Sequence, residues 1–492
     1  MNIKNLMALG ACALLAATVQ AEVKLNSMFC DHAVLQRNKP LPVWGSADVG
    51  ETITVSFAGQ NKTVTTGQDG RWRVTLSALP ASSEGRSLTV ASNQGGQPIV
   101  LVDVVVGDVW ICSGQSNMSF VLQLSSNARA QITDGTYPLF RHIKIAEAVA
   151  DTPESTVICR DKGWVPASPE WRNVGNFTAV GFFFGLKLHK ELNIPIGLIG
   201  ANWGGTKIEP WVAPEGYKRV PELKNISDKV EESLLNGSSM GASHQEPTRI
   251  YNAMIHPLVP YAIRGVIWYQ GEGNGGEGVS YFHKMRALIE GWRKLWNQGD
   301  FPFYFVQLAN YQNSPDTPAG GDGWAKIREA QRQALTIPNT GMAVSIDVGE
   351  ANDIHPKNKQ DVGVRLAAWA LAHEYGKDVV ASGPLYKSHV VTGNAIHVSF
   401  DYAGGGLMVA SKQGLAPPVE VKGGKLAHFS IAGADKVWHW AEGTIDGDTV
   451  IVSSTKVPSP VAVRYAFRMN PEGVNFYNRA GLPASPFRTD NW

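Results

Sequence analysis

Between residues 106 and 385 the sequence repeats one pattern, an apolar strand-like run that ends in a glycine-rich or polar loop. These runs alternate with stretches in which apolar residues have helical spacing. The strand-like runs are 104–111, 194–201, 262–269 and 341–349, and the main helical stretches are 178–192 and 357–376. Such alternation predicts an α/β region with a mostly parallel sheet. Ligands of such folds bind beyond the carboxyl ends of the strands, where these loops lie.

Two β-rich regions flank this part of the chain. In residues 22–105, the run 71–76 alternates strictly: Trp72, Val74 and Leu76 share one face, and polar residues share the other. This predicts a small sandwich. Residues 386–492 again read as short strands separated by Gly and Asp turns. We expect the two β regions to pack near each other.

The length and composition agree with several globular domains. The chain has 492 residues, more than a single hydrophobic core usually supports. Of these residues, 43% are hydrophobic and 18% are charged. Removing residues 1–21 would leave 43 basic and 43 acidic residues. A neutral chain gives no support for nucleic acid or an anionic membrane as a partner. No later segment is long and apolar enough to span a membrane.

The first 21 residues have the pattern of a secretory signal peptide. Lys4 precedes an apolar stretch, and Val19-Gln20-Ala21 provides a small-x-small cleavage site. This predicts a periplasmic or secreted protein. Three cysteines would remain after cleavage, namely Cys30, Cys112 and Cys159. One disulfide is then possible among them, and one thiol must stay unpaired.

Four loops at predicted strand ends carry the residue types that acyl transfer requires. They are Ser113–Met118, Asn202–Thr206, Gln270–Gly276 and 350–359. Together they offer a serine, glycine amides, a side-chain amide, and a histidine near acids, which suit a nucleophile, an oxyanion hole and a base. Each loop alone has a structural explanation, such as a helix cap or a tight turn. Their common position at strand ends favours a hydrolase.

Other chemistries find less support in the sequence. There is no H-E-x-x-H motif and no His/Cys spacing typical of zinc. A phosphate-binding G-x-x-x-x-G-K-[ST] loop is also absent, and the acids in the run 271–278 would repel phosphates. We therefore expect neither a metal nor an organic cofactor.

Several motifs together resemble the sialate O-acetylesterases of the SGNH hydrolase superfamily. They are "GDVWICSGQSNM", "IPIGLIGANWGGTKIEPW", "GVIWYQGEGN" and "NDIHPKNKQDVGVRLA". The segments 28–47 and 480–492 also resemble the family, so the similarity covers nearly all of the chain after residue 21. It implies a flavodoxin-like catalytic domain at 106–385, with β-rich accessory parts at 22–105 and 386–492.

The resemblance also implies roles for individual residues. Ser116 matches the nucleophile and His355 the catalytic base. The backbone N–H groups of Ser116 and Gly205, with the Gln270 amide in place of the superfamily's asparagine, match the oxyanion hole. The superfamily favours Asp-x-x-His, whereas here position 352 is Asn and Asp353 stands two residues before the histidine.

The acid and the substrate therefore stay open at this stage. Asp353 is the first candidate for the acid, Glu350 is the second, and a backbone carbonyl would leave a Ser–His dyad. We expect an esterase that acts on O-acetylated sialic acid, with acetylxylan or another acetylated carbohydrate as the alternative. A sialate carboxylate needs an arginine or neutral donors, and the sequence does not say whether Arg249, Arg264 or Arg328 provides one.

A third hypothesis is a catalytically inactive carbohydrate-binding protein. The β regions and the 15 tryptophans would fit that function. The sequence leaves the oligomeric state open.

Overall fold

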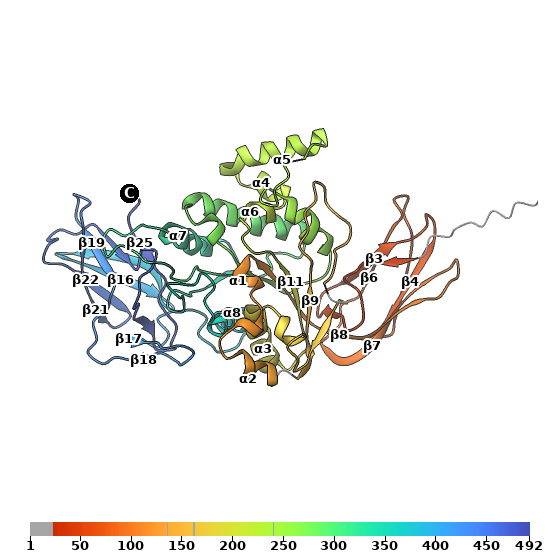
Figure 1. Ribbon diagram of the computed structural model, residues 1–492, viewed down its shortest axis with the longest axis horizontal. Coiled ribbons are helices and arrows are strands. Elements are labelled where there is room, and N and C mark those ends of the chain that lie inside the picture. The colour runs from red at the N-terminus through yellow and green to blue at the C-terminus, as the bar shows by residue number, and fades with distance from the viewer. Residues whose placement is uncertain (1–22, 135, 161–162, 240) are drawn as a thin grey trace, which may run out of the picture.

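The structure is a computed structural model that describes residues 23–134, 136–160, 163–239 and 241–492. The predicted signal peptide at 1–21 lies outside the described residues. Three regions follow one another along the long axis, with the N-terminal and C-terminal β regions at opposite ends and the α/β region between them (Figure 1). The expectation that the two β regions pack near each other is therefore wrong.

The N-terminal region is a small sandwich. One sheet has the order β1-β3-β6, and β4 pairs with both β5 and β7 in the other. In β6 the buried and exposed residues alternate without exception, as the sequence predicted. The turn at residues 67–70 joins β5 to β6 and carries the chain from one sheet to the other. The bounds are β1 Lys24–Leu25, β2 Val34–Gln36, β3 Leu41–Ser46, β4 Thr52–Phe57, β5 Gln60–Thr65, β6 Arg71–Leu76 and β7 Ser82–Ser92.

One strand, β8 (Ile99–Gly114), belongs to both the N-terminal region and the α/β region. Its first part pairs antiparallel with β7, and its last seven residues pair in parallel with β11. The predicted domain boundary at 105/106 thus falls inside a continuous strand. Position 107 in this strand requires a glycine, because a Cβ atom there would lie only 2.0 Å from the Pro195 carbonyl oxygen.

The central sheet has the order β10-β9-β11-β8-β12-β13-β14. All neighbouring pairs from β9 to β14 are parallel, and β10 is antiparallel to β9. Strands β11, β12 and β13 are buried along their whole length, as expected when helices cover both faces. The bounds are β9 Tyr137–Lys144, β10 Val165–Ala167, β11 Ile196–Asn202, β12 Gly265–Tyr269, β13 Phe303–Val306 and β14 Thr340–Ala343.

Helices cover both faces of this sheet (Figure 1). On one face α3 and α8 pack closely, because Gly363 of α8 leaves no space for a side chain against Phe183 of α3. On the other face α4 packs on α6 where Gly216 and Gly291 meet. The bounds are α1 Ser116–Ser119, α2 Ala128–Thr133, α3 Ala179–Leu192, α4 Pro214–Arg219, α5 Lys224–Asn236, α6 Val279–Trp296, α7 Ala325–Gln333 and α8 Lys359–His373.

The C-terminal region begins with β15, whose first residue coincides with the predicted boundary at 385/386. Its strands form sheets of order β15-β16-β22-β21, β18-β17-β24 and β20-β19-β23-β25. They enclose a hydrophobic core separate from the main one. The bounds are β15 Leu385–Thr392, β16 Ala395–Asp401, β17 Leu407–Ser411, β18 Val419–Glu420, β19 Phe429–Ala432, β20 Trp438–Trp440, β21 Glu442–Asp446, β22 Thr449–Ser453, β23 Ala462–Tyr465, β24 Phe476–Asn478 and β25 Phe487–Arg488.

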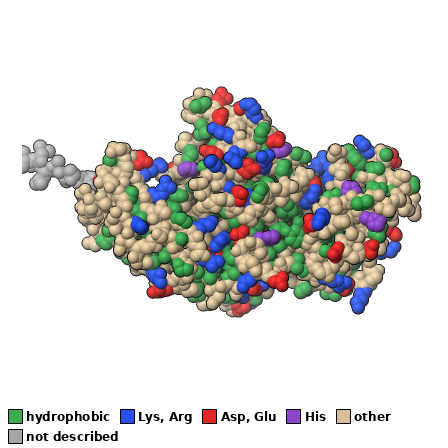
Figure 2. Space-filling model, turned by 180° about the vertical axis from the view of Figure 1, so that it is seen from behind, with side chains coloured by type: hydrophobic (Ala, Val, Ile, Leu, Met, Phe, Trp, Pro, Cys, Tyr) green, Lys and Arg blue, Asp and Glu red, His purple; other side chains and the backbone are tan. Residues whose placement is uncertain are grey.

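The surface is electrically mixed. Figure 2 shows Lys, Arg, Asp and Glu side chains interspersed over one face of the molecule, in keeping with the balanced charge count. Among the described residues, no helix is both long and apolar enough to cross a membrane. Cys30, Cys112 and Cys159 are free thiols, and Cys112 is fully buried in β8.

Candidate active site

The candidate nucleophile stands where β8 ends. The strand stops at Gly114, and Ser116 is the first residue of the short helix α1. Gly114 is required here, since its φ is 131° and a Cβ atom would lie 2.2 Å from the Tyr269 carbonyl oxygen. The Gln115 N–H then donates to the same oxygen at 3.0 Å. The chain therefore turns sharply and leaves Ser116 half-buried beyond the sheet.

The glycine loop after β11 lies directly against this turn. Asn202 is level with Gly114 in the parallel ladder, and the Trp203 N–H donates to the Gly114 carbonyl at 3.0 Å. A Cβ atom on Gly204 would be only 3.4 Å from that of Ser116. The loop therefore approaches the serine through backbone alone.

Two backbone N–H groups at this junction are open. Within the described residues, the N–H groups of Ser116 and Gly205 donate to no protein acceptor. Gly205 has φ of 75°, which turns the peptide as a glycine allows. These two N–H groups, which are the predicted oxyanion donors, are therefore free to donate to a ligand.

The side chain of Gln270 has a different environment from the one predicted. Its Nε2 donates to the Thr206 carbonyl at 3.1 Å and to Asn274 Oδ1 at 2.9 Å, and its Oε1 accepts from the Tyr281 hydroxyl. The residue is fully buried. Both N–H groups of this amide are thus occupied, so Gln270 braces the two loops and offers no free donor to an oxyanion.

The histidine loop, residues 350–358, follows β14 and precedes α8. It is attached to the serine turn by Asn117, whose Nδ2 donates to the Ile354 carbonyl at 3.0 Å. The His355 ring stacks on Phe120, the residue after α1, at a centroid distance of 6.3 Å. The fold therefore brings the surroundings of Ser116 and His355 together across the chain.

Asp353 is the acid that faces the histidine. Its Oδ1 lies 3.8 Å from His355 Nδ1, outside hydrogen-bond range, and accepts the His355 backbone N–H at 2.8 Å. The Glu350 carboxylate instead accepts the Lys357 N–H at 2.8 Å and closes the loop. Both carboxylates thus accept a backbone N–H of the loop, and Asp353 is the one that also lies near the imidazole.

Buried charges surround the candidate base. Burial lowers the pKa of His355, the Lys359 ammonium group lowers it further, and Asp353 opposes both. Burial lowers the pKa of Lys359 to about 7, although Glu272 favours its charged form. Burial also raises the pKa of Glu272. An imidazole in this setting is neutral near pH 7 and ready to accept a proton.

Three further residues at the site, Asn117, Glu272 and Lys359, have no distinguishing pattern in the sequence. Asn117 is next to Ser116 and Glu272 is two residues from Gln270, whereas Lys359 is the last residue of the predicted loop 350–359 and begins α8 in the structure. Their involvement depends on contacts between distant segments, which spacing does not reveal. Among the described residues, no group of three or more His, Cys, Asp or Glu side chains is arranged to hold a metal ion.

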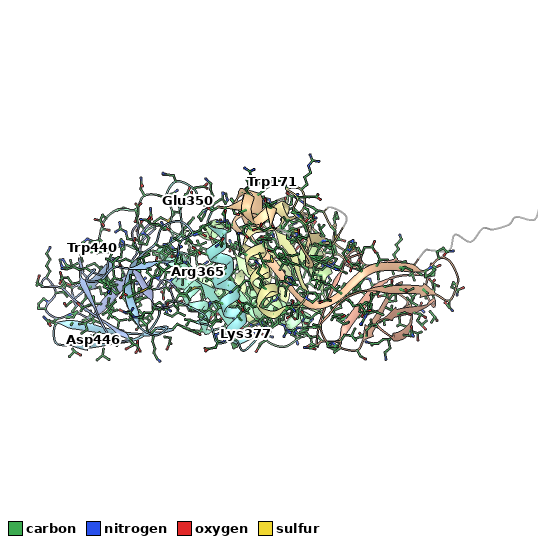
Figure 3. All side chains as sticks on the ribbon, turned by 90° about the horizontal axis from the view of Figure 1, so that it is seen from below. Trp171, Glu350, Arg365, Lys377, Trp440 and Asp446 are labelled. Atoms are coloured by element: carbon green, nitrogen blue, oxygen red, sulfur yellow. The ribbon has the colours of Figure 1, made fainter. Side chains whose placement is uncertain are left out.

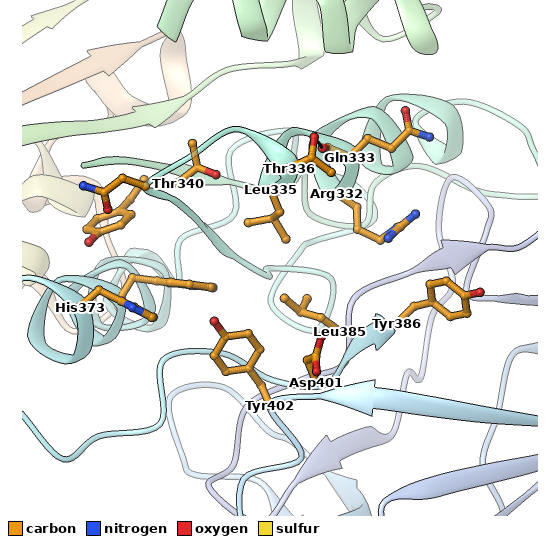
Figure 4. A pocket seen from close by; sticks show the side chains of 13 residues that line it. Arg332, Gln333, Leu335, Thr336, Thr340, His373, Leu385, Tyr386, Asp401 and Tyr402 are labelled. Atoms are coloured by element: carbon orange, nitrogen blue, oxygen red, sulfur yellow. Dashed lines mark hydrogen bonds between the residues drawn. The ribbon is translucent and has the colours of Figure 1, made fainter. Parts of the chain in front are cut away.

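These groups all lie at the carboxyl edge of the sheet. Figure 3 places Glu350 at one edge of the molecule and Lys377, beyond the end of α8, at the opposite edge. A cavity of about 450 Å³ opens at the other end, lined among others by Tyr304 of β13, Thr340 of β14 and Tyr402 (Figure 4). That cavity is therefore separate from the serine–histidine site.

The family model described as "Carbohydrate esterase, sialic acid-specific acetylesterase" matches residues 106–372. Sialate O-acetylesterase of Rattus norvegicus is 31% identical over 419 residues, which cover 74% of this chain and 76% of the relative. The Homo sapiens enzyme of the same name is 32% identical, covering 70% and 69%. The Mus musculus enzyme is 29% identical and covers 94% of each chain.

A solved structure is similar over nearly the whole chain. It is a carbohydrate acetylesterase from Xanthomonas citri, 38% identical, with a TM-score of 0.84. The match covers 96% of this chain and 100% of that one, so both β regions are included.

Proposed function

Because the chain belongs to the carbohydrate esterase family of sialic acid-specific acetylesterases, we propose that it removes O-acetyl groups from sialic acid. Membership of this family makes it a carboxylic ester hydrolase. The observation that carries the proposal is the junction at the carboxyl edge of the sheet. There Ser116 meets the glycine loop, and Asn117 holds the histidine loop beside it.

The proposed reaction has two steps. Ser116 Oγ attacks the ester carbonyl carbon while His355 takes the hydroxyl proton, and the N–H groups of Ser116 and Gly205 hold the oxyanion. The intermediate collapses to an acetyl-serine as His355 returns the proton to the departing sugar oxygen. Water, deprotonated by His355, then releases acetate and restores the serine.

Asp353 is the proposed orienting acid of this site. Its carboxylate near Nδ1 would fix the tautomer of His355 and stabilise the imidazolium formed during attack. We expect Asp353→Asn to lower kcat substantially, but less than His355→Ala does. Wild-type kcat in Asp353→Asn together with a severe loss in Glu350→Gln would transfer the role to Glu350. If neither acid variant loses activity, the enzyme works as a dyad.

The test of the proposed chemistry is Ser116→Ala. The variant should fold normally and lose about 10³-fold or more of kcat on acetylated sialic acid. A serine-directed fluorophosphonate should label Ser116 in the wild-type protein and leave the variant unlabelled. Undiminished turnover by the purified variant would remove Ser116 from the mechanism.

One observation favours a second substrate class, a neutral acetylated carbohydrate. The three arginines considered above for a sialate carboxylate are engaged elsewhere: Arg264 pairs with Asp108, Arg328 donates to four carbonyls, and Arg249 pairs with Asp151. The relative from Xanthomonas citri is described as a carbohydrate acetylesterase. Acetate release from acetylated sialic acid, compared with release from acetylated xylan, distinguishes the two.

Two further proposals concern the architecture and the destination of the protein. We infer a flavodoxin-like SGNH hydrolase domain, which the strand order supports. Without the edge strands β9 and β10, the central sheet has the order 2-1-3-4-5. We also infer export, which rests on the signal-peptide pattern of residues 1–21.

A further inference from the structure

A buried chain of polar groups lies behind the serine and reaches the histidine loop. Asn117 Nδ2 donates to Glu272 Oε1 at 2.5 Å and to the Ile354 carbonyl at 3.0 Å, and Asn117 Oδ1 accepts from Lys359 Nζ at 2.5 Å. The amide is thus saturated by three partners from two other segments. It connects the nucleophile helix, the loop after β12, and the residue before the catalytic histidine.

Lys359 is an unusual residue for this position. It is fully buried at the start of α8, where the positive end of a helix disfavours a cation. Its ammonium group lies 4.8 Å from the centre of the Phe120 ring and 5.5 Å from that of Tyr269. A buried lysine held by one amide and two ring faces costs stability, so a functional reason for it is expected.

The same Phe120 ring connects the lysine to the catalytic base. It packs against the Lys359 ammonium group and also stacks with the His355 imidazole. Lys359 therefore touches both neighbours of the site, the amide next to Ser116 and the ring beside His355.

Building on the proposed function, we propose that Lys359 is a positioning residue. Held through Asn117 and Phe120, it fixes the histidine loop against the nucleophile helix. Its positive charge has a second effect, because it opposes protonation of His355 and so keeps the base neutral in mildly acid solution.

The other charges in the neighbourhood determine the sign of this effect. Glu272 faces Lys359 from the loop after β12, and Asp353 and Glu350 face it from the histidine loop. The three carboxylates favour the charged lysine. Asp353 also favours charged His355, so Lys359 is the one ionic group that favours neutral His355 among the described residues.

The test is a titration of His355 by NMR in the full-length protein, with its signal assigned from the His355→Gln variant. Lys359→Met should raise the midpoint by about 0.5–1 pH unit, since the cation is lost while burial and Asp353 remain. Lys357→Met, an exposed lysine two residues from the histidine, is the matched control and should leave the midpoint unchanged. An unmoved midpoint in Lys359→Met would overturn the electrostatic role.

Kinetics test the positioning role. At the pH of maximal activity Lys359→Met should have about 10- to 100-fold lower kcat with KM nearly unchanged, because only the alignment of Ser116 and His355 is lost. The acid limb of its kcat/KM profile should follow the NMR midpoint to higher pH. Wild-type kcat at the plateau would overturn the positioning role.

A second variant covers the case in which Lys359→Met does not fold. Glu272→Gln keeps the acceptor for Asn117 but removes the anion that favours charged Lys359. The lysine should then lose its proton at lower pH, and the His355 midpoint should again rise, by less than in Lys359→Met. No movement would count against the proposal.

The titration does not depend on catalysis. If Ser116→Ala retained activity, the proposed function would fail while the His355 midpoint still reported on Lys359. If Ser116→Ala is inactive and the midpoint is unmoved, the lysine proposal fails alone.

Discussion

The two β regions are attached to the catalytic region in different ways. The N-terminal region shares a strand, β8, with the central sheet, and its buried side chains belong to the same hydrophobic core as those of the catalytic region. The C-terminal region has a core of its own. Its contacts with the catalytic region are both polar and apolar. Arg328 donates to the carbonyls of Arg468 and Met469, and Gln307 Nε2 donates to Ser485 Oγ. Met469 also belongs to the main core, and Tyr402 packs on Trp369. A shared core makes two regions unfold together, whereas a region with most of its buried side chains in its own core can unfold separately.

The largest expected difference is between the solubilities of two variants, each of which lacks one of the β regions. Removing residues 22–98 takes the partners from the first half of β8 and exposes the main core, so we expect insoluble protein. Removing residues 386–492 should leave a soluble, folded remainder with a lower Tm. Expression yield and circular dichroism measure both outcomes. A soluble, active protein without residues 22–98 would break the comparison.

The charged cluster at the N-terminal junction should have the next largest effect. Asp108 of β8 is fully buried and binds Arg37 from the N-terminal region and Arg264 and Tyr375 from the catalytic region. Asp108→Ala leaves two partly buried guanidinium groups without their carboxylate, which should cost about 3–5 kcal/mol. Urea unfolding followed by fluorescence and by esterase activity should show one coincident, shifted transition. Two separate transitions would contradict the shared core.

Matched valines sharpen the comparison at a smaller cost. Val43 and Val452 are both fully buried, one in the main core and one in the C-terminal core. Replacing either with Ala should cost about 1–3 kcal/mol locally. In calorimetry, Val43→Ala should lower the transition that abolishes activity, whereas Val452→Ala should lower only the transition of the C-terminal region. Equal effects of the two variants on the active transition would show that the cores are coupled.

The smallest expected effect is on the Tm at acid pH. Burial raises the pKa of Asp108, but Arg264 and Arg37 outweigh it and hold the pKa below its usual value. The folded state therefore binds this proton less readily than the unfolded chain, so the stabilisation is present above about pH 4 and disappears as the pH falls through the folded pKa. The wild-type Tm should decline more steeply below pH 4 than that of Asp108→Asn. Parallel declines would remove Asp108 as a cause.

Much of the fold and of the site follows from local patterns. The alternation in residues 71–76 and the strand-then-loop runs depend on neighbours in sequence, and the structure has them where they were expected. Three predictions failed for tertiary reasons. The two β regions lie at opposite ends of the molecule, because each packs on a different side of the α/β region. The domain boundary predicted at 105/106 falls inside β8, because that strand pairs with both β7 and β11. The Gln270 amide found partners within the protein that its spacing does not reveal.

The buried network shows the same limit at the site. Ser116, Gly205, His355 and Asp353 stand in motifs that can be read one at a time. The role proposed for Lys359 depends on its contacts with Asn117 and Glu272, which lie 242 and 87 positions earlier in the chain. No periodicity connects residues so far apart.

The sixteen residues of β8 also restrict how this molecule can move. The strand that supports the N-terminal sandwich is the one that ends beside Ser116. We therefore expect the sandwich and the serine turn to behave as one rigid unit. The β7 ladder on β8 ends at Val106 and the β11 ladder begins at Asp108, and β2 pairs across this junction at residues 105–107, so a bend there would have to break the pairing with β2. The N-terminal region and the serine turn should therefore keep their relative orientation, so that the sandwich serves as the fixed base of the site.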